Sequence, residues 1–86
     1  MAYNNRGGAW FILKDYQRAI DDYNKVIQCD SKTTDGYYNR GFVKQTMGDY
    51  TGAIEDYTHA IENKPEQPDV VYSNRGNVKA ILKDYK

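Results

Sequence analysis

Cysteine and long hydrophobic runs are nearly absent from this sequence of 86 residues. Its one cysteine, Cys29, can form no internal disulfide, whereas small secreted domains usually depend on disulfides for stability. We therefore expect a reducing, cytoplasmic location. No apolar run approaches the roughly 20 residues that cross a bilayer, so the sequence predicts no membrane partner.

An excess of charge of one sign is also missing, because 12 basic residues balance 12 acidic ones. A nucleic-acid surface needs extra cations to displace the counterions of the phosphates, and an anionic membrane attracts a basic patch. The balance argues against both partners. Aromatic residues, in contrast, make up 14% of the chain, which is too many for a disordered linker.

Residues for metal binding or catalysis do not occur in the required groupings. His59 is the only histidine, and Cys29 has no second cysteine with which to form a zinc site. Gly7-Gly8 is not followed by the lysine and hydroxyl residue of a phosphate-binding loop. We therefore expect no metal, no cofactor and no enzymatic activity.

What the chain does contain is an internal repeat. The string Tyr-x-Asn-Arg-Gly occurs at 3–7, 37–41 and 72–76, with spacings of 34 and 35 residues. Eleven residues are identical between the first two units, where about two are expected by chance. We expect one domain over 1–86, with full units at 1–34 and 35–68 and a partial unit at 69–86.

Each full unit has the pattern of two helices. Ala19, Ile20, Tyr23, Val26 and Ile27 form an apolar stripe of helical period, which the second unit repeats. No alternating pattern indicates a strand. The expected helices cover residues 2–13, 17–29, 35–47, 51–63 and 69–82, which gives an all-α fold of five helices.

Turn residues separate these helices. Asp15 and Asp49 precede the stripes as expected N-caps, and Gly48 is suited to end the helix before it. Residues 65–69, which begin with Pro65, have the composition of a loop. The connections are therefore short, and successive helices are antiparallel.

Glycine recurs inside the first helix of every unit, at Gly7, Gly41 and Gly76. It costs about 1 kcal/mol relative to alanine there, so its recurrence predicts that another helix passes too close for a side chain. Ala19 and Ala53 are the expected small partners. Antiparallel helix pairs that stack, each unit touching only its neighbours, form a solenoid.

These features together resemble the tetratricopeptide repeat family. The resemblance lies in the 34-residue period, the Tyr-x-Asn-Arg-Gly start, the Asp-Tyr-x-x-Ala joint and Pro65, and covers the chain as about two and a half units. It implies a right-handed superhelical solenoid whose concave groove is lined by the first helix of each unit. It also implies a scaffold that holds peptides or helices of partner proteins.

The resemblance and the helical phase together predict a groove of nearly uncharged residues: Asn4, Asn5, Tyr38, Asn39, Phe42, Gln45, Ser73, Asn74 and Asn77. Asn5, Asn39 and Asn74 recur once per unit, although asparagine is a poor helix residue. Their amides could bind the backbone of a partner, or they could bind neighbouring helices and fix the stacking. The sequence leaves both explanations open.

One branch of the family grips acidic C-terminal tails of chaperones with lysines, arginines and asparagines. In this chain Asn39 matches that pattern, whereas Asn4, Gly8, Val70 and Asn74 stand at the other positions. The resemblance therefore predicts a partner of a different kind.

Arginine and aspartate also recur together, as Arg6, Arg40 and Arg75 in the first helices and as Asp22 and Asp56 in the second. A row of guanidinium groups could bind an anionic ligand. The shared period favours a structural role instead, in which each arginine pairs with an aspartate across a helix interface.

The third unit has only its first helix, so we expect Val71, Val78, Ile81 and Leu82 to lack complete burial. Tyr3 and Trp10 form a second apolar edge. Repeat proteins generally need about three units and polar ends. Two explanations are open: the chain is a fragment of a longer protein that supplies the missing helix, or two chains cover each other's ends. The second explanation gives the alternative function, a self-assembling unit that forms a homodimer or larger homo-oligomer through the terminal helices.

Overall fold

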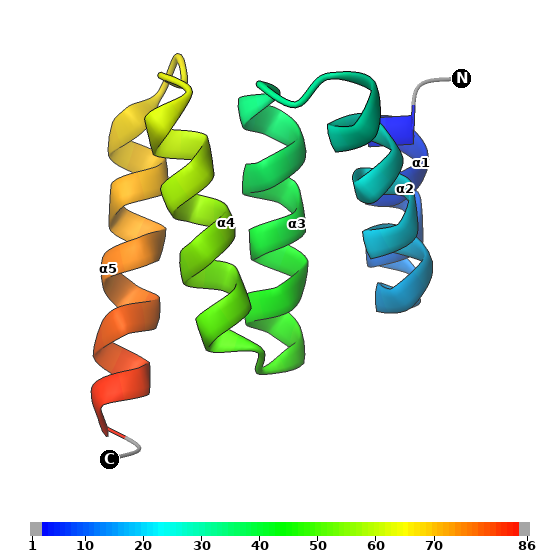
Figure 1. Ribbon diagram of the computed structural model, residues 1–86. Helices are drawn as coiled ribbons and strands as arrows, with labels where there is room; N and C mark the ends of the chain where they lie inside the picture. Colours follow the sequence, from blue (N-terminus) through cyan, green and yellow to red (C-terminus); the bar gives the residue numbers. More distant parts are fainter. Residues whose placement is uncertain (1–2, 85–86) are drawn as a thin grey trace.

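Five α-helices make up the computed structural model, which describes residues 3–84 and the side chains of residues 5–83. The helices are α1 (Tyr3–Ile12), α2 (Tyr16–Cys29), α3 (Thr34–Met47), α4 (Tyr50–Glu62) and α5 (Pro68–Asp84). They run back and forth from α1 at one end of Figure 1 to α5 at the other. No strand occurs within residues 3–84. The all-α fold is confirmed, and the helix ends differ from the expected ones by at most two residues.

Aspartates begin α2 and α4, as predicted. The carboxylates of Asp15 and Asp49 each accept a hydrogen bond from a backbone N–H three residues later, at 3.2 and 3.0 Å. Gly48 ends α3 in the left-handed conformation, with φ of 89°. Lys14 has the equivalent place after α1 and a φ of 65°, so the first turn puts a lysine in a conformation that favours glycine.

The connection between α4 and α5 covers residues 63–67, two residues earlier in the chain than the predicted loop. Lys64 follows α4 with φ of 60°, immediately before Pro65. α5 then begins at Pro68, because proline at the first helical position lacks only an N–H donor that would have no partner there. The predicted loop is therefore wrong at Pro68, which begins α5 one residue before the expected helix start at residue 69.

Neighbouring helices pack in sequence order, α1 against α2, α2 against α3, α3 against α4 and α4 against α5. The buried residues form two clusters, one of Ala19, Tyr23 and Val43 and one of Ala53, Tyr57, Ala60, Val71 and Val78. Each cluster joins a helix pair to the first helix of the following unit. This is the arrangement expected of a solenoid, in which each unit touches only its neighbours.

The first two repeated glycines lie against aromatic rings. A Cβ atom at Gly7 would come within 2.8 Å of the Tyr23 ring, and one at Gly41 within 3.0 Å of the Tyr57 ring. The predicted close approach is confirmed at both positions. The nearest atoms belong to Tyr23 at Gly7 and to Tyr57 and Asp56 at Gly41, and not to the expected partners Ala19 and Ala53. Glycine leaves space for a ring, not for a helix backbone.

The third glycine differs from the other two, because a Cβ atom at Gly76 would meet nothing within 4 Å. The prediction of a close helix is wrong there, since no described helix follows α5. Val71 and Val78, in contrast, are 4% and 0% exposed. They were expected to lack complete burial, and that expectation is wrong because their shared face of α5 packs on α4.

Candidate functional site

Two buried carboxylates hold the helix pairs together. Arg6 donates two hydrogen bonds to Asp22, at 2.8 and 2.7 Å, and Arg40 donates two to Asp56, at 2.9 and 2.7 Å. Both aspartates are buried. The bond from Arg6 holds the pKa of Asp22 below its ordinary value, against the effect of burial. The predicted ion pairs are therefore present. Their carboxylates are buried, and the arginine side chains are partly exposed.

The arginines also connect successive units. The Arg40 guanidinium donates to the Asn24 side chain of the preceding unit at 2.9 Å. Arg75 donates to the Thr58 hydroxyl at 3.2 Å, and Thr58 is the repeat equivalent of Asn24. Each of these arginines thus links the first helix of its own unit to the second helix of the preceding unit. This geometry supports the structural role predicted for the arginine row.

Aromatic side chains form a row across α1 and α3, which we call the aromatic row. The rings of Phe11 and Phe42 lie with their centroids 5.5 Å apart, and those of Phe42 and Tyr38 lie 6.5 Å apart. The Tyr38 hydroxyl accepts a hydrogen bond of 2.8 Å from the Asn74 amide of α5. The row therefore covers α1 and α3, and this hydrogen bond connects its end to α5. Phe42 is 38% exposed, which leaves apolar surface for a ligand.

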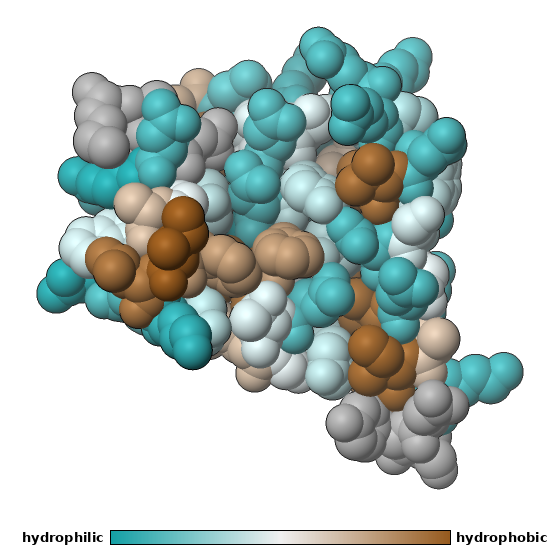
Figure 2. Space-filling view, turned by 180° about the vertical axis from the view of Figure 1, so that it is seen from behind, coloured by the Kyte–Doolittle hydropathy of each residue, from teal (hydrophilic) through white to brown (hydrophobic). Residues whose placement is uncertain are grey.

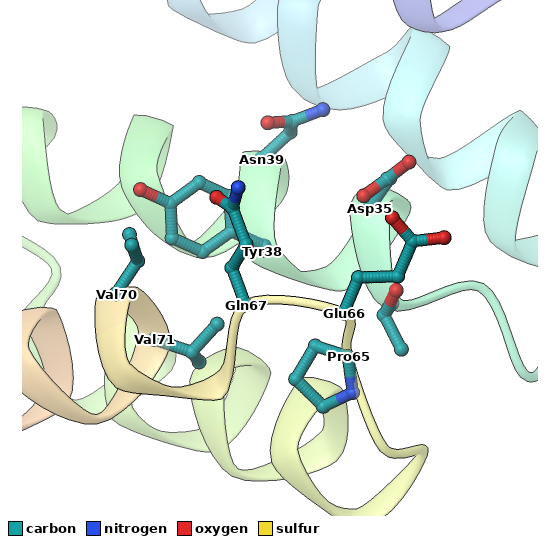
Figure 3. Close-up of a pocket in the computed structure, with 9 residues that line it drawn as sticks. Asp35, Tyr38, Asn39, Pro65, Glu66, Gln67, Val70 and Val71 are labelled. Carbon is teal, nitrogen blue, oxygen red and sulfur yellow. The ribbon is translucent and has the colours of Figure 1, made fainter.

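A hollow of about 450 Å³ opens beside the end of this row. It lies between the first two turns of α3, the α4–α5 connection and the start of α5, and is lined by Thr34, Asp35, Tyr38, Asn39, Pro65, Glu66, Gln67, Val70 and Val71. Figure 3 shows Asp35 and Glu66 on the same side of the hollow, away from Val70. No lysine or arginine lines it, so the hollow is acidic. The predicted groove residues Tyr38 and Asn39 are uncharged, but in the hollow they lie beside the carboxylates of Asp35 and Glu66.

The repeated asparagines have different environments. Asn74 binds Tyr38 of the neighbouring helix, as the packing explanation requires. Asn39 lines the hollow, and within the described residues its side chain makes no hydrogen bond. Asn5 is exposed on α1. Only Asn39 therefore combines a place in the hollow with a free amide.

The other predicted groove residues lie along the first helices. Gln45 accepts a hydrogen bond of 2.7 Å from the hydroxyl of the buried Tyr57, so its side chain is bonded to the hydrophobic core. Ser73 and Asn77 are exposed on α5. The side chain of Asn4, and that of Tyr3 from the predicted self-association set, lie outside the described residues.

The remaining self-association residues are only partly available. Trp10 is half-buried against the first core cluster, with the Arg18 guanidinium 4.8 Å above its ring. Ile81 and Leu82 are partly buried. Figure 2 shows one side of the molecule, on which the apolar surface lies in separate groups rather than in one continuous patch. Ile81 and Leu82 therefore lack complete burial, as the sequence predicted, and their part in self-association stays a prediction.

Sequence reasoning missed several residues of the hollow. Asp35, Glu66 and Gln67 come from two segments that are far apart in the sequence. Glu66 lies between Pro65 and Pro68. In this segment one residue is inserted, because the second and third Tyr-x-Asn-Arg-Gly strings are 35 residues apart and the first and second are 34 apart. That departure from the period was the available signal, because insertions in repeats change the loops on one face.

Comparison with known proteins identifies the family. The sequence matches the family model described as tetratricopeptide repeat over residues 8–80. No curated protein sequence matches the chain. Because the family model covers most of its length, the chain belongs to the tetratricopeptide repeat family, a family of non-enzymatic repeats that mediate protein–protein interaction.

Several solved structures are similar in fold. The first TPR of Spaghetti (RPAP3), bound to the HSP90 peptide SRMEEVD, is 23% identical with a TM-score of 0.85, over 94% of this chain and 64% of that one. YrrB, a TPR protein with an unusual peptide-binding site, is 25% identical with a TM-score of 0.86, over 94% and 41%. MamA is 30% identical with a TM-score of 0.71, over 94% and 51%. This chain thus spans between 41% and 64% of the length of these three structures.

The described part of the chain, residues 3–84, offers neither a membrane span nor a metal site among its own residues. No helix there is long and apolar enough to cross a membrane. No group of three or more histidine, cysteine or acidic side chains within residues 3–84 could hold a metal ion. The hollow and the aromatic row are therefore the features on which a function can be argued.

Proposed function

We propose that this chain binds an extended segment of a partner protein along the aromatic row, with a cationic group of that segment in the acidic hollow. The observation that carries the proposal is the hollow itself, where a free Asn39 amide faces the same space as two carboxylates. The family membership supports a protein partner, and the hollow supplies the chemistry that would select it.

Three kinds of contact are available to such a segment. Asp35 and Glu66 are both exposed and attract a lysine, an arginine or a peptide N-terminus. The amide of Asn39 offers one acceptor and one donor to a peptide backbone. Phe42 and Tyr38 offer apolar surface to a side chain further along the segment. Together they favour a segment with an apolar residue close to a positive charge.

The charge of the hollow also predicts what is not bound. The peptide in the Spaghetti structure, SRMEEVD, carries acidic residues at its C-terminal end. Such a tail would bring carboxylates against Asp35 and Glu66, and like charges repel at short distance. We therefore expect acidic tails to bind weakly, in agreement with the mismatch at the clamp positions.

A peptide selection tests this proposal. Peptides selected on the chain from a random displayed library are expected to be enriched in lysine or arginine near an apolar residue. A selected peptide should lose about tenfold in affinity for Asn39→Ala, and more for the double variant Asp35→Asn with Glu66→Gln. The matched control replaces two exposed carboxylates of α4, Glu55→Gln with Glu62→Gln, and should bind normally.

Two outcomes would overturn the proposal. One is equal affinity of the double hollow variant and the control variant for the selected peptide. The other is a selection that yields mainly acidic peptides. Either result would show that the hollow does not set the specificity.

Self-association is the second candidate, and the turn after α1 favours it. Ile12 and Leu13 are 80% and 70% exposed, side by side. Exposed apolar residues in such a pair are a common feature of interfaces. Sedimentation at increasing concentration should show an oligomer that Ile12→Lys with Leu13→Lys dissociates, whereas a wild-type chain that stays monomeric rejects this candidate. The cytoplasmic location, which rests on the single cysteine, stays a prediction.

A further inference from the structure

Tyr38 belongs both to the aromatic row and to the lining of the acidic hollow. Its ring is packed on two sides, with its centroid 5.8 Å from that of the buried Tyr57 and 6.5 Å from that of Phe42. A ring held between two others keeps one orientation in close-packed surroundings. The direction in which its hydroxyl points is therefore set by the fold.

The Tyr38 hydroxyl accepts a hydrogen bond, and within the described residues it donates none. The group that donates to it is the side-chain amide of Asn74 on α5, at 2.8 Å. A phenolic oxygen that accepts keeps its own proton for donation, and the bond that it receives strengthens the bond that it gives. Tyr38 thus offers a polarised O–H donor to a ligand.

This pair of residues is particular to one junction of the repeats. The positions equivalent to Tyr38 hold Asn4 in the first unit and Ser73 in the third, whereas every unit has asparagine at the position of Asn74. The tyrosine is therefore not a requirement of the repeat itself. The bond joins α3 to α5, so the hollow beside it has described helices on both sides.

The hollow has two polar ends with an apolar wall between them. Asp35 and Glu66 form one end, and Figure 3 shows the Tyr38 hydroxyl pointing away from these carboxylates, toward the side of Val70. The Tyr38 ring lies between the two ends, and Pro65 adds further apolar atoms to the lining. A ligand that uses both ends needs a cation and a hydrogen-bond acceptor, separated by an apolar segment that covers the ring.

We propose that the hollow binds the side chain of an internal lysine or arginine of the partner segment, and that the Tyr38 hydroxyl donates to the backbone carbonyl of that same residue. The cation reaches Asp35 and Glu66, and the apolar stem of the side chain lies along the Tyr38 ring. Asn74 is the positioning residue, because it holds the hydroxyl as an acceptor and so directs its proton to the ligand. The inference rests on the proposed function and names the group that the hollow selects.

A free N-terminus fits this geometry less well than a basic side chain. Only one carbon atom separates its ammonium group from the first carbonyl carbon, so an N-terminus at the carboxylates leaves that carbonyl beside the Tyr38 ring and short of the hydroxyl. A basic side chain spans the ring, and a cation near an aromatic face gains further attraction. Acetylation of a lysine removes its charge, so acetylation of the partner should release it.

The test measures the binding of four short peptides to the isotope-labelled full chain by nuclear magnetic resonance. All are built of alanine and leucine. The first has one internal lysine and both ends blocked, and the second has arginine in place of the lysine. The third has acetyl-lysine, and the fourth has a free N-terminus and no basic side chain. The titrations extend to millimolar peptide.

The lysine and arginine peptides should shift the backbone amide resonances of residues that line the hollow, among them Asp35, Asn39 and Val70. The acetyl-lysine peptide and the free N-terminus peptide should bind about tenfold more weakly, because each lacks a cation that can reach the carboxylates while its carbonyl meets the hydroxyl. Comparison of the lysine and arginine peptides shows whether the planar guanidinium fork adds affinity.

Two protein variants test the donor. Tyr38→Phe keeps the ring and removes the hydroxyl. Asn74→Asp replaces the amide by an acceptor, to which the Tyr38 hydroxyl then gives its proton. Each should weaken binding of the lysine peptide about fivefold, and Asn74→Asp should weaken it no further in the Tyr38→Phe background. Both variants keep the ring that packs on Tyr57, and their amide spectra report whether they fold.

The control for the added charge is Ala80→Asp, at an exposed position of α5 that does not line the hollow. It should bind the lysine peptide with unchanged or slightly higher affinity, because a negative charge attracts a cationic peptide. A loss of affinity for Asn74→Asp therefore reports the direction of the hydrogen bond and not the charge.

A change in the peptide tests the acceptor. An ester in place of the amide bond that follows the lysine makes its carbonyl a weaker acceptor. This change should cost the wild-type chain about threefold more in affinity than it costs Tyr38→Phe. The N–H group that the ester removes affects both proteins equally.

The results that reject the inference differ from those that reject the proposed function. Absent shifts with both basic peptides, equal affinity of the free N-terminus peptide, or undiminished binding to Tyr38→Phe would each overturn the inference. Unchanged binding to Asn74→Asp would show that Asn74 does not orient the hydroxyl. Normal binding of the lysine peptide to Asp35→Asn with Glu66→Gln would instead remove the hollow as the site, and the proposed function with it.

Discussion

α3 and α5 begin the second and third repeats with the same string, Tyr-x-Asn-Arg-Gly, and yet their residues have different surroundings. On α3, Gly41 lies under an aromatic ring and Arg40 binds a buried carboxylate. On α5, Gly76 meets nothing and Arg75 reaches back to a threonine hydroxyl. The comparison teaches that the same string makes different contacts in the two repeats, so that its contribution to stability depends on which side chains the fold brings against it.

The largest expected difference is between the two arginines. Arg40→Ala should lower the free energy of unfolding by about 3 kcal/mol, because it leaves the buried Asp56 without its main partner. Arg75→Ala should lower it by less than about 1 kcal/mol, because only one hydrogen bond to a neutral hydroxyl is lost. Urea denaturation of both variants measures the difference. Similar losses for the two would mean that the ion pair to Asp56 contributes little.

Substituting alanine for Gly41 and for Gly76 should change the free energy of unfolding in opposite directions and by different amounts. Gly41→Ala should lower the free energy of unfolding by about 1–2 kcal/mol, since its Cβ would meet the Tyr57 ring at 3.0 Å and the ring must shift. Gly76→Ala should raise it by about 0.5–1 kcal/mol, since alanine favours the helix and nothing obstructs it. Thermal unfolding followed by circular dichroism is sufficient, and a stabilised Gly41→Ala variant would contradict the close approach.

The ion pair between Arg6 and Asp22 in the first repeat should make the stability of the chain depend on pH. The hydrogen bond from Arg6 lowers the pKa of Asp22 in the folded state, so the folded chain binds fewer protons than the unfolded chain between the two pKa values. This contribution is complete above about pH 4 and is lost as the pH falls through the folded-state pKa. Between about pH 6 and about pH 2.5, Asp22→Asn should therefore lose less stability than the wild-type chain.

The control for this prediction is Glu62→Gln, an exposed carboxylate on α4, which should leave the acid profile almost unchanged. Urea midpoints measured across the pH range provide the test. A wild-type chain and an Asp22→Asn variant with parallel profiles would show that the Arg6 pair contributes nothing to acid unfolding.

The smallest expected effect concerns the turns after α1 and α3. Lys14 and Gly48 have the same place and both have positive φ, 65° and 89°. Lys14→Gly should raise the free energy of unfolding by about 0.5 kcal/mol, and Gly48→Lys should lower it by about 0.5–1 kcal/mol. Urea denaturation measures both changes in the free energy of unfolding. Changes of opposite sign would confirm that the first turn is strained relative to the second, and changes of equal sign would reject that strain.

Local signals predicted the helices well because they depend on near neighbours in the sequence. Asp15 and Asp49 cap α2 and α4, and Gly48 ends α3, each through a bond or a backbone angle within a few residues. The ion pairs were also predictable, because Arg40 and Asp56 recur with the same period as the helices that carry them. The one local error, at Pro68, came from counting a helix-starting proline as part of the loop.

Contacts between distant segments were predicted less well. The hollow joins Asp35 of α3 to Glu66 of the α4–α5 connection, and neither residue belongs to a repeated string. The three asparagines share one sequence position, yet Asn74 binds a tyrosine and Asn39 binds nothing among the described residues. Periodicity places residues on a face but does not say which side chain meets which.

The sequence by itself determined the repeat, its period, the helices and the family, because each follows from patterns within about one unit of chain. Only the tertiary structure decided which of the repeated residues are engaged. It showed tyrosines over Gly7 and Gly41, open space over Gly76, and buried Val71 and Val78 where exposure was expected. The physical reason is that burial and hydrogen bonding depend on which helix lies across the interface, and identical strings can face different neighbours.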